Sequence, residues 1–249
     1  MKEPPVWPAG HALRHLEEID STNEEARRLA VAGVEGPLWI LADRQIRGRG
    51  RRGREWHSLA GNLSATLLLH PASRVSESAQ LSFVAALAAC DLVAHHAPAA
   101  AVKLKWPNDV LADGRKIAGI LLEASGNDAA APDWLAIGFG VNLVWHPTDA
   151  EFPATSLLAQ RAHPPAAPDA LARLAAGWAG WYDLWESLGF APIRNAWLAR
   201  AAGIGERIRA RLPGEEATGV FEGIDESGAL LLRESTNRLR TIAAADVFF

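Results

Sequence analysis

The chain of 249 residues contains few of the residue types that build disulfide, metal or membrane proteins. Its single cysteine, Cys90, excludes an internal disulfide and a multi-cysteine metal site. Because Cys90 lies in the apolar run FVAALAACDLV, we interpret it as a core residue without a catalytic role. No window reaches the roughly 18 uncharged apolar residues that a membrane-spanning helix needs. The sequence therefore predicts a cytoplasmic globular protein with no membrane partner.

Charge is also nearly balanced, with a formal net charge of -4 and a pI near 6.1. This composition gives no general attraction to nucleic acid, so an anion site has to be built from a local cluster of cations. Lysine is scarce, because only four of the 25 Lys and Arg residues are lysines. Three of these four are Lys103, Lys105 and Lys116, which marks that short segment as one with a function.

Hydrophobic residues make up 49% of the sequence, which is enough for one substantial core and a small further domain. Residues 21–33 are typical of an amphipathic helix, and we expect a side chain of the run that starts at Ser21 to cap its first N–H groups. Further helices are predicted at 77–96 and 171–188, and strands at 37–43, 61–70, 101–106, 108–112, 116–124 and 134–144. This order predicts an α+β fold, a mixed β-sheet with helices on one face.

Two features of the second half refine this organisation. Trp178, Trp181 and Trp185 lie on one face of the helix predicted at 171–188, a spacing that favours core packing over ligand stacking. After residue 202 the pattern changes to short strands and glycine turns, which is typical of a small β-barrel-like domain. We therefore predict a catalytic domain over 1–202 and a β domain over 203–249.

An arginine and glycine loop, RQIRGRGRRGR, occupies residues 44–54 between two predicted strands. Glycine lets backbone N–H groups approach a phosphate, and guanidinium groups pair with phosphate or carboxylate oxygens. The loop is therefore predicted to bind an anion and to order around it as a lid. A solvated basic loop and a nucleic-acid patch are the alternatives. Trp56, just after the loop, is expected to pack beside a ligand ring or at the strand edge.

The lysine-rich segment VKLKWPNDVLADGRKIAGILLE spans residues 102–123. Asn108 and Asp109 follow a proline bend, where an amide and a carboxylate can hold Mg²⁺, a ribose or a polar head group, or can simply form a turn. Lys116 is at the start of the next strand, whose rigid neighbours hold the aliphatic part of its side chain in place. Its ammonium is therefore suited to bind a carboxylate or an α-phosphate. A solvated hairpin lysine is the alternative for Lys116. Gly119 allows a ligand or backbone to approach that strand.

The motifs STN, GRGRRGR with Trp56, KWPNDV, RKIAGILLE and IGFGVNL occur in this order, and their combination resembles the catalytic core of the biotin–protein ligases. The interval of eleven residues from Lys105 to Lys116 is the most specific part. The C-terminal segment is similar to the family's SH3-like domain. The resemblance implies a class II aminoacyl-tRNA synthetase-like ligase core followed by that domain.

The resemblance also implies roles for individual residues. Lys116 and Arg51 become the catalytic residues, and Asp109 becomes a ligand of Mg²⁺. The implied biotin-binding residues are Ser21, Thr22, Asn23, Gln45, Arg49, Gly50, Arg51 and Lys116. The implied ATP- and adenylate-binding residues are Gly48, Arg49, Arg51, Arg52, Trp56, Asn108, Asp109 and Asn142, with Gly138 and Gly140 on the strand that walls the pocket. Arg47 departs from the family, which usually has a small residue there, so packing at the base of the loop is expected to differ.

The implied activity has two half-reactions. Biotin attacks the α-phosphate of Mg-ATP to give biotinyl-AMP and pyrophosphate, and a lysine of a biotin carboxyl carrier protein, from acetyl-CoA carboxylase or another biotin-dependent carboxylase, then attacks the adenylate. Some family members carry an N-terminal winged-helix repressor domain. Only about 20 residues precede the STN motif, so we expect a monofunctional ligase without nucleic-acid binding. Homodimerisation through the sheet is left open. The rival readings are a lipoate or octanoate ligase of related fold and a nucleic-acid-binding protein.

Overall fold

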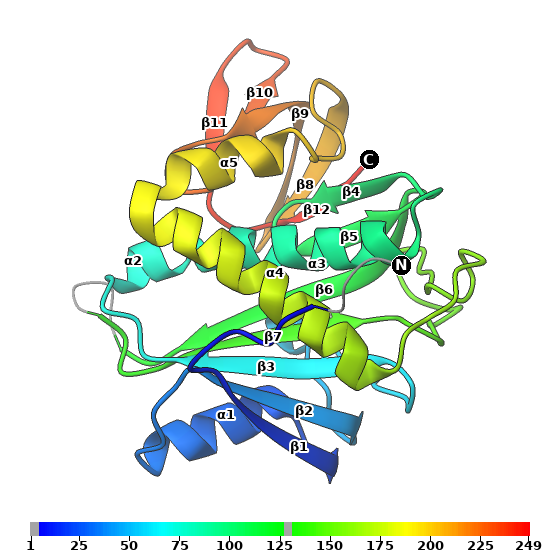
Figure 1. The fold of residues 1–249 in the computed structure, drawn as a ribbon. Helices are drawn as coiled ribbons and strands as arrows, with labels where there is room; N and C mark the ends of the chain where they lie inside the picture. The colour runs from blue at the N-terminus through cyan, green and yellow to red at the C-terminus, as the bar shows by residue number, and fades with distance from the viewer. Residues whose placement is uncertain (1–4, 127–130) are drawn as a thin grey trace.

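The computed structural model describes residues 5–126 and 131–249, which form a large mixed sheet, a set of helices and a second sheet (Figure 1). The large sheet has the strand order β1-β2-β3-β7-β6-β5-β4, and its neighbours are antiparallel except for the parallel pair β1 and β2. The strands are β1 (Ala12–Ile19), β2 (Leu38–Gln45), β3 (Leu63–Leu69), β4 (Val102–Lys105), β5 (Asp109–Ala112), β6 (Arg115–Ala124) and β7 (Leu135–Val141).

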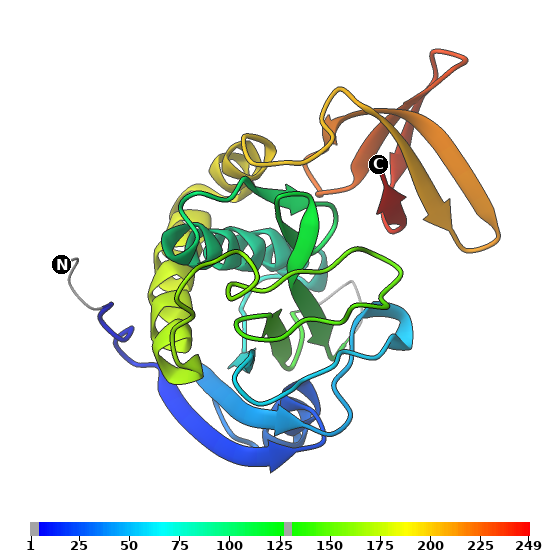
Figure 2. The same ribbon diagram turned by 90° about the vertical axis from the view of Figure 1, so that its right-hand side faces the viewer.

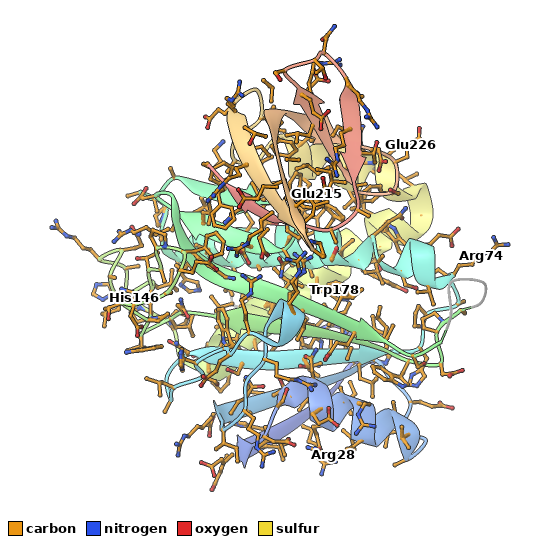
Figure 3. The ribbon with its side chains drawn as sticks, turned by 180° about the vertical axis from the view of Figure 1, so that it is seen from behind. Arg28, Arg74, His146, Trp178, Glu215 and Glu226 are labelled. Carbon is orange, nitrogen blue, oxygen red and sulfur yellow. The ribbon has the colours of Figure 1, made fainter. Side chains whose placement is uncertain are left out.

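Helices cover both faces of this sheet, because strand residues alternate between the two faces. On β7, Ile137 and Phe139 join the main core beneath α3 and α4, whereas Ala136 packs beneath α1 and Gly138 lies against Asn23 of that helix. The helices are α1 (Thr22–Val31), α2 (Val75–Ser78), α3 (Leu81–His96), α4 (Ala167–Leu188) and α5 (Phe190–Leu198), with a 3₁₀ turn at Arg51–Gly53. Figure 3, seen from behind, places α1 with Arg28 on the near side of the sheet.

The second sheet stands to one side of the large one, beyond α5 (Figure 2). Its antiparallel strands have the order β11-β10-β9-β8-β12. They are β8 (Arg207–Leu212), β9 (Glu215–Ile224), β10 (Leu230–Glu234), β11 (Leu239–Ile242) and β12 (Asp246–Phe248). The buried indole of Trp106 donates a hydrogen bond of 2.9 Å to the carbonyl of Gly228, which ties this sheet to the segment between β4 and β5. The predicted α+β fold class with a small C-terminal β domain is confirmed, but the prediction that the helices lie on one face of the large sheet is wrong, because α1 packs on the face opposite to α3 and α4.

Packing of the tryptophans follows the prediction in part. Trp178, labelled in Figure 3, is fully buried in the core. Its ring packs edge-on against Phe139. Trp181 and Trp185 are half-buried at the edge of the same core and donate hydrogen bonds to Asp91 and Gln80. Trp178 therefore packs in the core as expected, whereas the indole N–H groups of Trp181 and Trp185 have polar partners at the edge of the core.

Two local predictions are wrong. The single helix expected over 77–96 is interrupted, because Ser82 and Phe83 donate to carbonyls three residues earlier and thus form a tight turn between α2 and α3. The side-chain cap expected on α1 is absent, since Ser21 makes no capping hydrogen bond. The N–H of Thr22 instead donates to Oε1 of Gln45 at 2.7 Å, so the helix start is fixed by a tertiary contact.

Elements β1 and α5 were not predicted. β1 is an exposed edge strand of sequence ALRHLEEI, which carries too few apolar residues to show a pattern with a period of two. Among the residues that the structure describes, no helix is long and apolar enough to cross a membrane.

Candidate active site

A cavity of about 390 Å³ opens on the α1 face of the large sheet. Its walls come from the start of α1, the arginine loop, strands β5 to β7 and the segment 147–154, and β12 closes one side. The predicted site residues that line it are Ser21, Thr22, Asn23, Gln45, Arg49, Gly50, Arg51, Trp56, Asn108, Asp109, Lys116, Gly138, Gly140 and Asn142. Residues from distant parts of the sequence are thus brought into one cavity.

The end of the cavity beside α1 is a hydrogen-bonded polar pocket. Thr66 of β3 is fully buried, and its Oγ1 lies within hydrogen-bond distance of both Thr22 Oγ1, at 2.8 Å, and Asn23 Oδ1, at 2.6 Å. Thr22 donates in turn to Oε1 of Gln45, while the Asn23 amide donates to Glu123. Paired donors and acceptors held this rigidly suit a neutral ring that carries both an N–H and a carbonyl group.

Glycines form the floor of the cavity. A Cβ atom added to Gly138 would overlap the side chain of Asn23, and one added to Gly140 would overlap the indole of Trp56. Gly119 of β6 similarly lies against Trp56 and the end of the Lys116 side chain. Glycine at 119 and 140 therefore leaves room for the Trp56 ring beside the sheet, and glycine at 138 leaves room for Asn23.

Lys116 lies in the middle of the cavity. Its Nζ is 2.7 Å from Asp109 Oδ1 and 5.6 Å from the centre of the Trp56 ring. Its backbone donates to the carbonyl of Pro153 and accepts from Thr155, which fixes the segment 147–154 over the cavity. The ammonium is thus held on a rigid strand with its charge facing the cavity.

Arg51 is the loop arginine that turns inward. Its Nη1 lies 3.4 Å from Oδ1 of Asn108, and burial lowers the pKa of its guanidinium. An arginine stays charged even when its pKa falls, so Arg51 and Lys116 place two positive charges in the cavity. The arrangement can stabilise an anion that gains charge during a reaction.

Three other arginines of the loop, Arg49, Arg52 and Arg54, are paired with carboxylates. Arg49 lies near Glu24 and Glu123, at 3.1 and 3.5 Å. Arg52 and Arg54 both pair with Asp246 of β12, at 3.2 and 2.7 Å. The loop is therefore joined to α1 and β6 at one end and to the second sheet at the other.

Predicted residues Gly48 and Arg52 do not line the cavity. An added Cβ at Gly48 would overlap the carbonyl of Trp56, whose N–H donates to the Gly48 carbonyl, so this glycine shapes the loop. Arg52 points to Asp246. Asn142 lines the cavity, but its amide donates to the carbonyl of Thr155 and so supports the wall.

Sequence reasoning missed several lining residues, among them Lys105, Glu151, Phe152 and Asp246. Lys105 could have been found, because it is the first lysine of the KWPND motif and follows a predicted strand. Asp246 could not, since nothing in the sequence relates a carboxylate near the C-terminus to a loop almost 200 residues earlier.

The cavity suits a metal ion that shares its ligands with a substrate. Across residues 5–126 and 131–249 there is no cluster of three His, Cys, Asp or Glu side chains that could hold a metal alone. Asp109 Oδ1 is buried and, despite its ion pair with Lys116, accepts no hydrogen bond of good geometry. Such an oxygen beside the Asn108 amide fits Mg²⁺, which typically takes one or two carboxylates and completes its shell with phosphates and water.

Together the fold and the cavity define an α+β protein with a cavity that suits an anionic ligand, between a polar pocket and an arginine loop. Residues 16–142 match the model of the Biotin/lipoate A/B protein ligase family, and residues 203–249 match that of the Biotin protein ligase C terminal domain. The chain belongs to the biotin/lipoate A/B protein ligase family, and its second match assigns it to the biotin protein ligases within that family.

Individual relatives agree with this assignment. The chain is 48% identical over 240 residues to the biotin–[acetyl-CoA-carboxylase] ligase of Paracoccus denitrificans, with 94% of this chain and 99% of that protein covered. It is 32% identical to the bifunctional ligase/repressor BirA of Bacillus subtilis, with 96% and 74% covered. The biotin protein ligase of Aquifex aeolicus in complex with biotin and ATP superposes with a TM-score of 0.80 at 26% identity, covering 95% of this chain and 98% of that one.

Proposed function

We propose that the protein is a biotin–protein ligase, which activates biotin with ATP and transfers it to a lysine of a biotin carboxyl carrier protein. The similarity to the Paracoccus ligase over nearly its whole length carries this conclusion. The cavity supports it, because a neutral polar pocket adjoins a cationic region and both are sized for small ligands.

The polar pocket is proposed to bind the ureido ring of biotin. That ring presents N–H donors and a carbonyl acceptor, and Thr22, Asn23 and Gln45 offer complementary groups. Ser21 lines the same end. The valerate chain would then extend over the glycine floor toward Lys116, which would bring the carboxylate to the cations.

In the first half-reaction a carboxylate oxygen of biotin attacks the α-phosphorus of ATP. The bond from this phosphorus to the bridging oxygen breaks, and the electron pair leaves with pyrophosphate. Lys116 and Arg51 are proposed to stabilise the charge that grows on the phosphate oxygens. Asn108 and Asp109 would hold Mg²⁺, which when bound supplies further charge neutralisation of the phosphates.

In the second half-reaction the amine of the carrier lysine attacks the acyl carbon and AMP leaves. No side-chain nucleophile is required, so catalysis comes from positioning and charge. We propose that Arg49, Gly50 and Arg51 close over the adenylate with Gly48 and Arg52 supporting the loop, and that closure excludes water. Trp56 would pack beside the ligand rings.

Two other functions fit the structure less well. A lipoate or octanoate ligase would place a flexible apolar chain beside the polar groups of Thr22, Asn23 and Gln45, and such a chain offers these groups no hydrogen-bonding partner. Nucleic-acid binding is disfavoured because Arg49, Arg52 and Arg54 are already paired with carboxylates.

A substrate comparison tests the proposal. The protein is mixed with Mg-ATP and with biotin, lipoate or octanoate in separate reactions, and pyrophosphate release is measured together with the mass gain of a biotin carboxyl carrier domain. We expect both signals with biotin alone. Pyrophosphate release and carrier labelling with lipoate or octanoate, and none with biotin, would refute the assignment.

A further inference from the structure

Lys105 is a buried cation that takes no part in the reaction steps proposed above. It ends β4, only 6% of its surface is exposed, and it lines both the main cavity and an adjoining hollow of about 200 Å³. Its Nζ lies 3.6 Å from the centre of the Phe152 ring. Phe248 and Phe249 of the second sheet's terminal segment lie next, at 5.9 and 5.8 Å.

The charge of Lys105 has no counter-ion. Within residues 5–126 and 131–249, its ammonium makes no ion pair and no hydrogen bond, and its contacts are aromatic faces. Asp109 lies opposite Lys105 in the β4–β5 register but forms its ion pair with Lys116. Aromatic faces offer an ammonium no hydrogen-bond acceptors, so the donors of Lys105 are available to an anionic ligand in the cavity.

The charged groups around Lys105 indicate which kind of ligand could accept hydrogen bonds from its ammonium. Burial lowers the pKa of Lys105 to about 8, Lys116 and Arg54 disfavour its charge, and Asp109 and Asp246 favour it. At neutral pH the side chain is still mainly an ammonium. Because Asp109 stands between Lys105 and Lys116, a chain of phosphates running through this region would meet one lysine after the other.

We infer that Lys105 binds the β- and γ-phosphates of ATP and stabilises pyrophosphate as it leaves, while Lys116 meets the α-phosphate. This assignment rests on the proposed function. As the bond from the α-phosphorus to the bridging oxygen breaks, the electron pair and the new negative charge stay on pyrophosphate, next to the Lys105 ammonium. Lys105 therefore acts in the adenylation half-reaction only, because pyrophosphate has left before the carrier lysine attacks.

Variant Lys105→Met tests this separation of roles, since methionine keeps an unbranched stem and suits the aromatic surroundings. Lys103→Met is the matched control, because Lys103 is on the same strand and exposed. We expect Lys105→Met to weaken calorimetric binding of magnesium pyrophosphate roughly tenfold or more. It should slow pyrophosphate release from biotin and ATP by at least as much, and should transfer preformed biotinyl-AMP to the carrier within about twofold of wild type. Lys103→Met should match wild type in all three assays.

Unchanged pyrophosphate binding in Lys105→Met, or an equal loss in the transfer step, would overturn the assignment. Lys105→Arg gives a second test that does not depend on how the methionine variant folds, because arginine stays charged. We expect the pyrophosphate affinity of wild type, divided by that of Lys105→Arg, to fall as the pH rises through about 8. The ratio cancels the titration of pyrophosphate itself, and a ratio that is constant from pH 6.5 to 9.5 would count against Lys105.

These outcomes are distinct from a failure of the proposed function. If wild type released no pyrophosphate with biotin, the ligase assignment would fail, whereas the binding of pyrophosphate to the protein alone would still decide the role of Lys105.

Discussion

At the scale of single residues, position on the sheet decides which cations serve the reaction. Lys116 is a quarter exposed and faces the cavity from a strand that hydrogen bonds hold on both sides. Lys103, two residues before Lys105 on the same strand, is exposed, whereas Lys105 is buried against the second sheet. Sequence reasoning identified Lys116 from its spacing but could not show that Asp109 pairs with it, because side-chain contacts depend on strand register.

Replacing Lys116 by alanine should abolish adenylate formation. The substitution removes the ammonium that would face the biotin carboxylate and the α-phosphate, and no other lysine can occupy its place on β6. We expect pyrophosphate release to fall by at least about a hundredfold, in line with the loss of one transition-state donor. The measurement is a coupled pyrophosphate assay, with Lys103→Ala as the control. Normal release from Lys116→Ala would show that this lysine is not catalytic.

Gly140→Ala should damage the site without damaging the fold. The added methyl group would overlap the Trp56 indole, which must then move away from the cavity floor. A displacement of this kind far exceeds the tolerance of a positioned site, so we expect kcat/KM to fall about a hundredfold. Gly180→Ala is a matched control, because Gly180 is exposed on α4 with open space around it, and alanine should raise the free energy of unfolding by about 0.5–1 kcal/mol. Equal activity in the two variants would refute the role given to Gly140.

At the scale of elements, the apolar pattern of the sequence predicted most of the strands and helices. The remaining features depend on tertiary contacts. Strands β2, β3, β6 and β7 were predicted because their apolar residues fill the core. The turn between α2 and α3 contains no glycine or proline, so its sequence gives no signal. It is held by Gln80, whose side chain accepts from Trp185 and donates to the Glu226 carbonyl.

The start of α1 has its own pH dependence. Arg28 donates to both oxygens of Asp20, and this contact lowers the pKa of Asp20 from 3.8 to about 2. A carboxyl group with a lowered pKa stabilises the fold above its unfolded value and loses that contribution as the pH falls through its folded value. The stability that Arg28 provides should therefore be complete above about pH 5 and decline from pH 4 to pH 2.

Denaturant unfolding of wild type and Arg28→Met across this range measures the difference. Both side chains are about a third or more exposed, so we expect a difference of no more than about 1 kcal/mol at pH 6. Arg44→Met, which removes an exposed pair with Glu18, should change stability little. A difference between wild type and Arg28→Met that stays constant down to pH 2 would contradict the coupling to Asp20.

At the scale of the whole molecule, the second sheet completes the cavity of the first. Asp246 is buried and accepts from Arg54 of the loop and from Arg211 of β8, with Arg52 also within ion-pair distance. The adjacent Phe248 and Phe249 rings lie toward Lys105. The composition of residues 203–249 predicted a β domain, but its contribution to the site appears only in the three-dimensional structure because it depends on how the two sheets meet.

Asp246→Asn, a change in the second sheet, should therefore weaken the closure of the arginine loop. Asparagine keeps the shape but removes the charge that draws Arg52 and Arg54 together, so those arginines would repel each other and the loop would spend more time open. Biotin binding at the polar pocket should be nearly unchanged, whereas biotinyl-AMP should dissociate faster and label lysines of bystander proteins. Labelling of a bystander mixture, measured against carrier labelling, should rise roughly tenfold if each of the two lost ion pairs weakens loop closure by about 0.7 kcal/mol.

Glu222→Gln is the matched control for this variant, because Glu222 pairs with Arg233 inside the second sheet and touches neither the loop nor the cavity. It loses the same charge from the same domain, so its bystander labelling should equal that of wild type. If Asp246→Asn also kept its labelling limited to the carrier, the second sheet would not control the loop, and the closure of the adenylate site would have to come from Arg49 and its contacts with Glu24 and Glu123 alone.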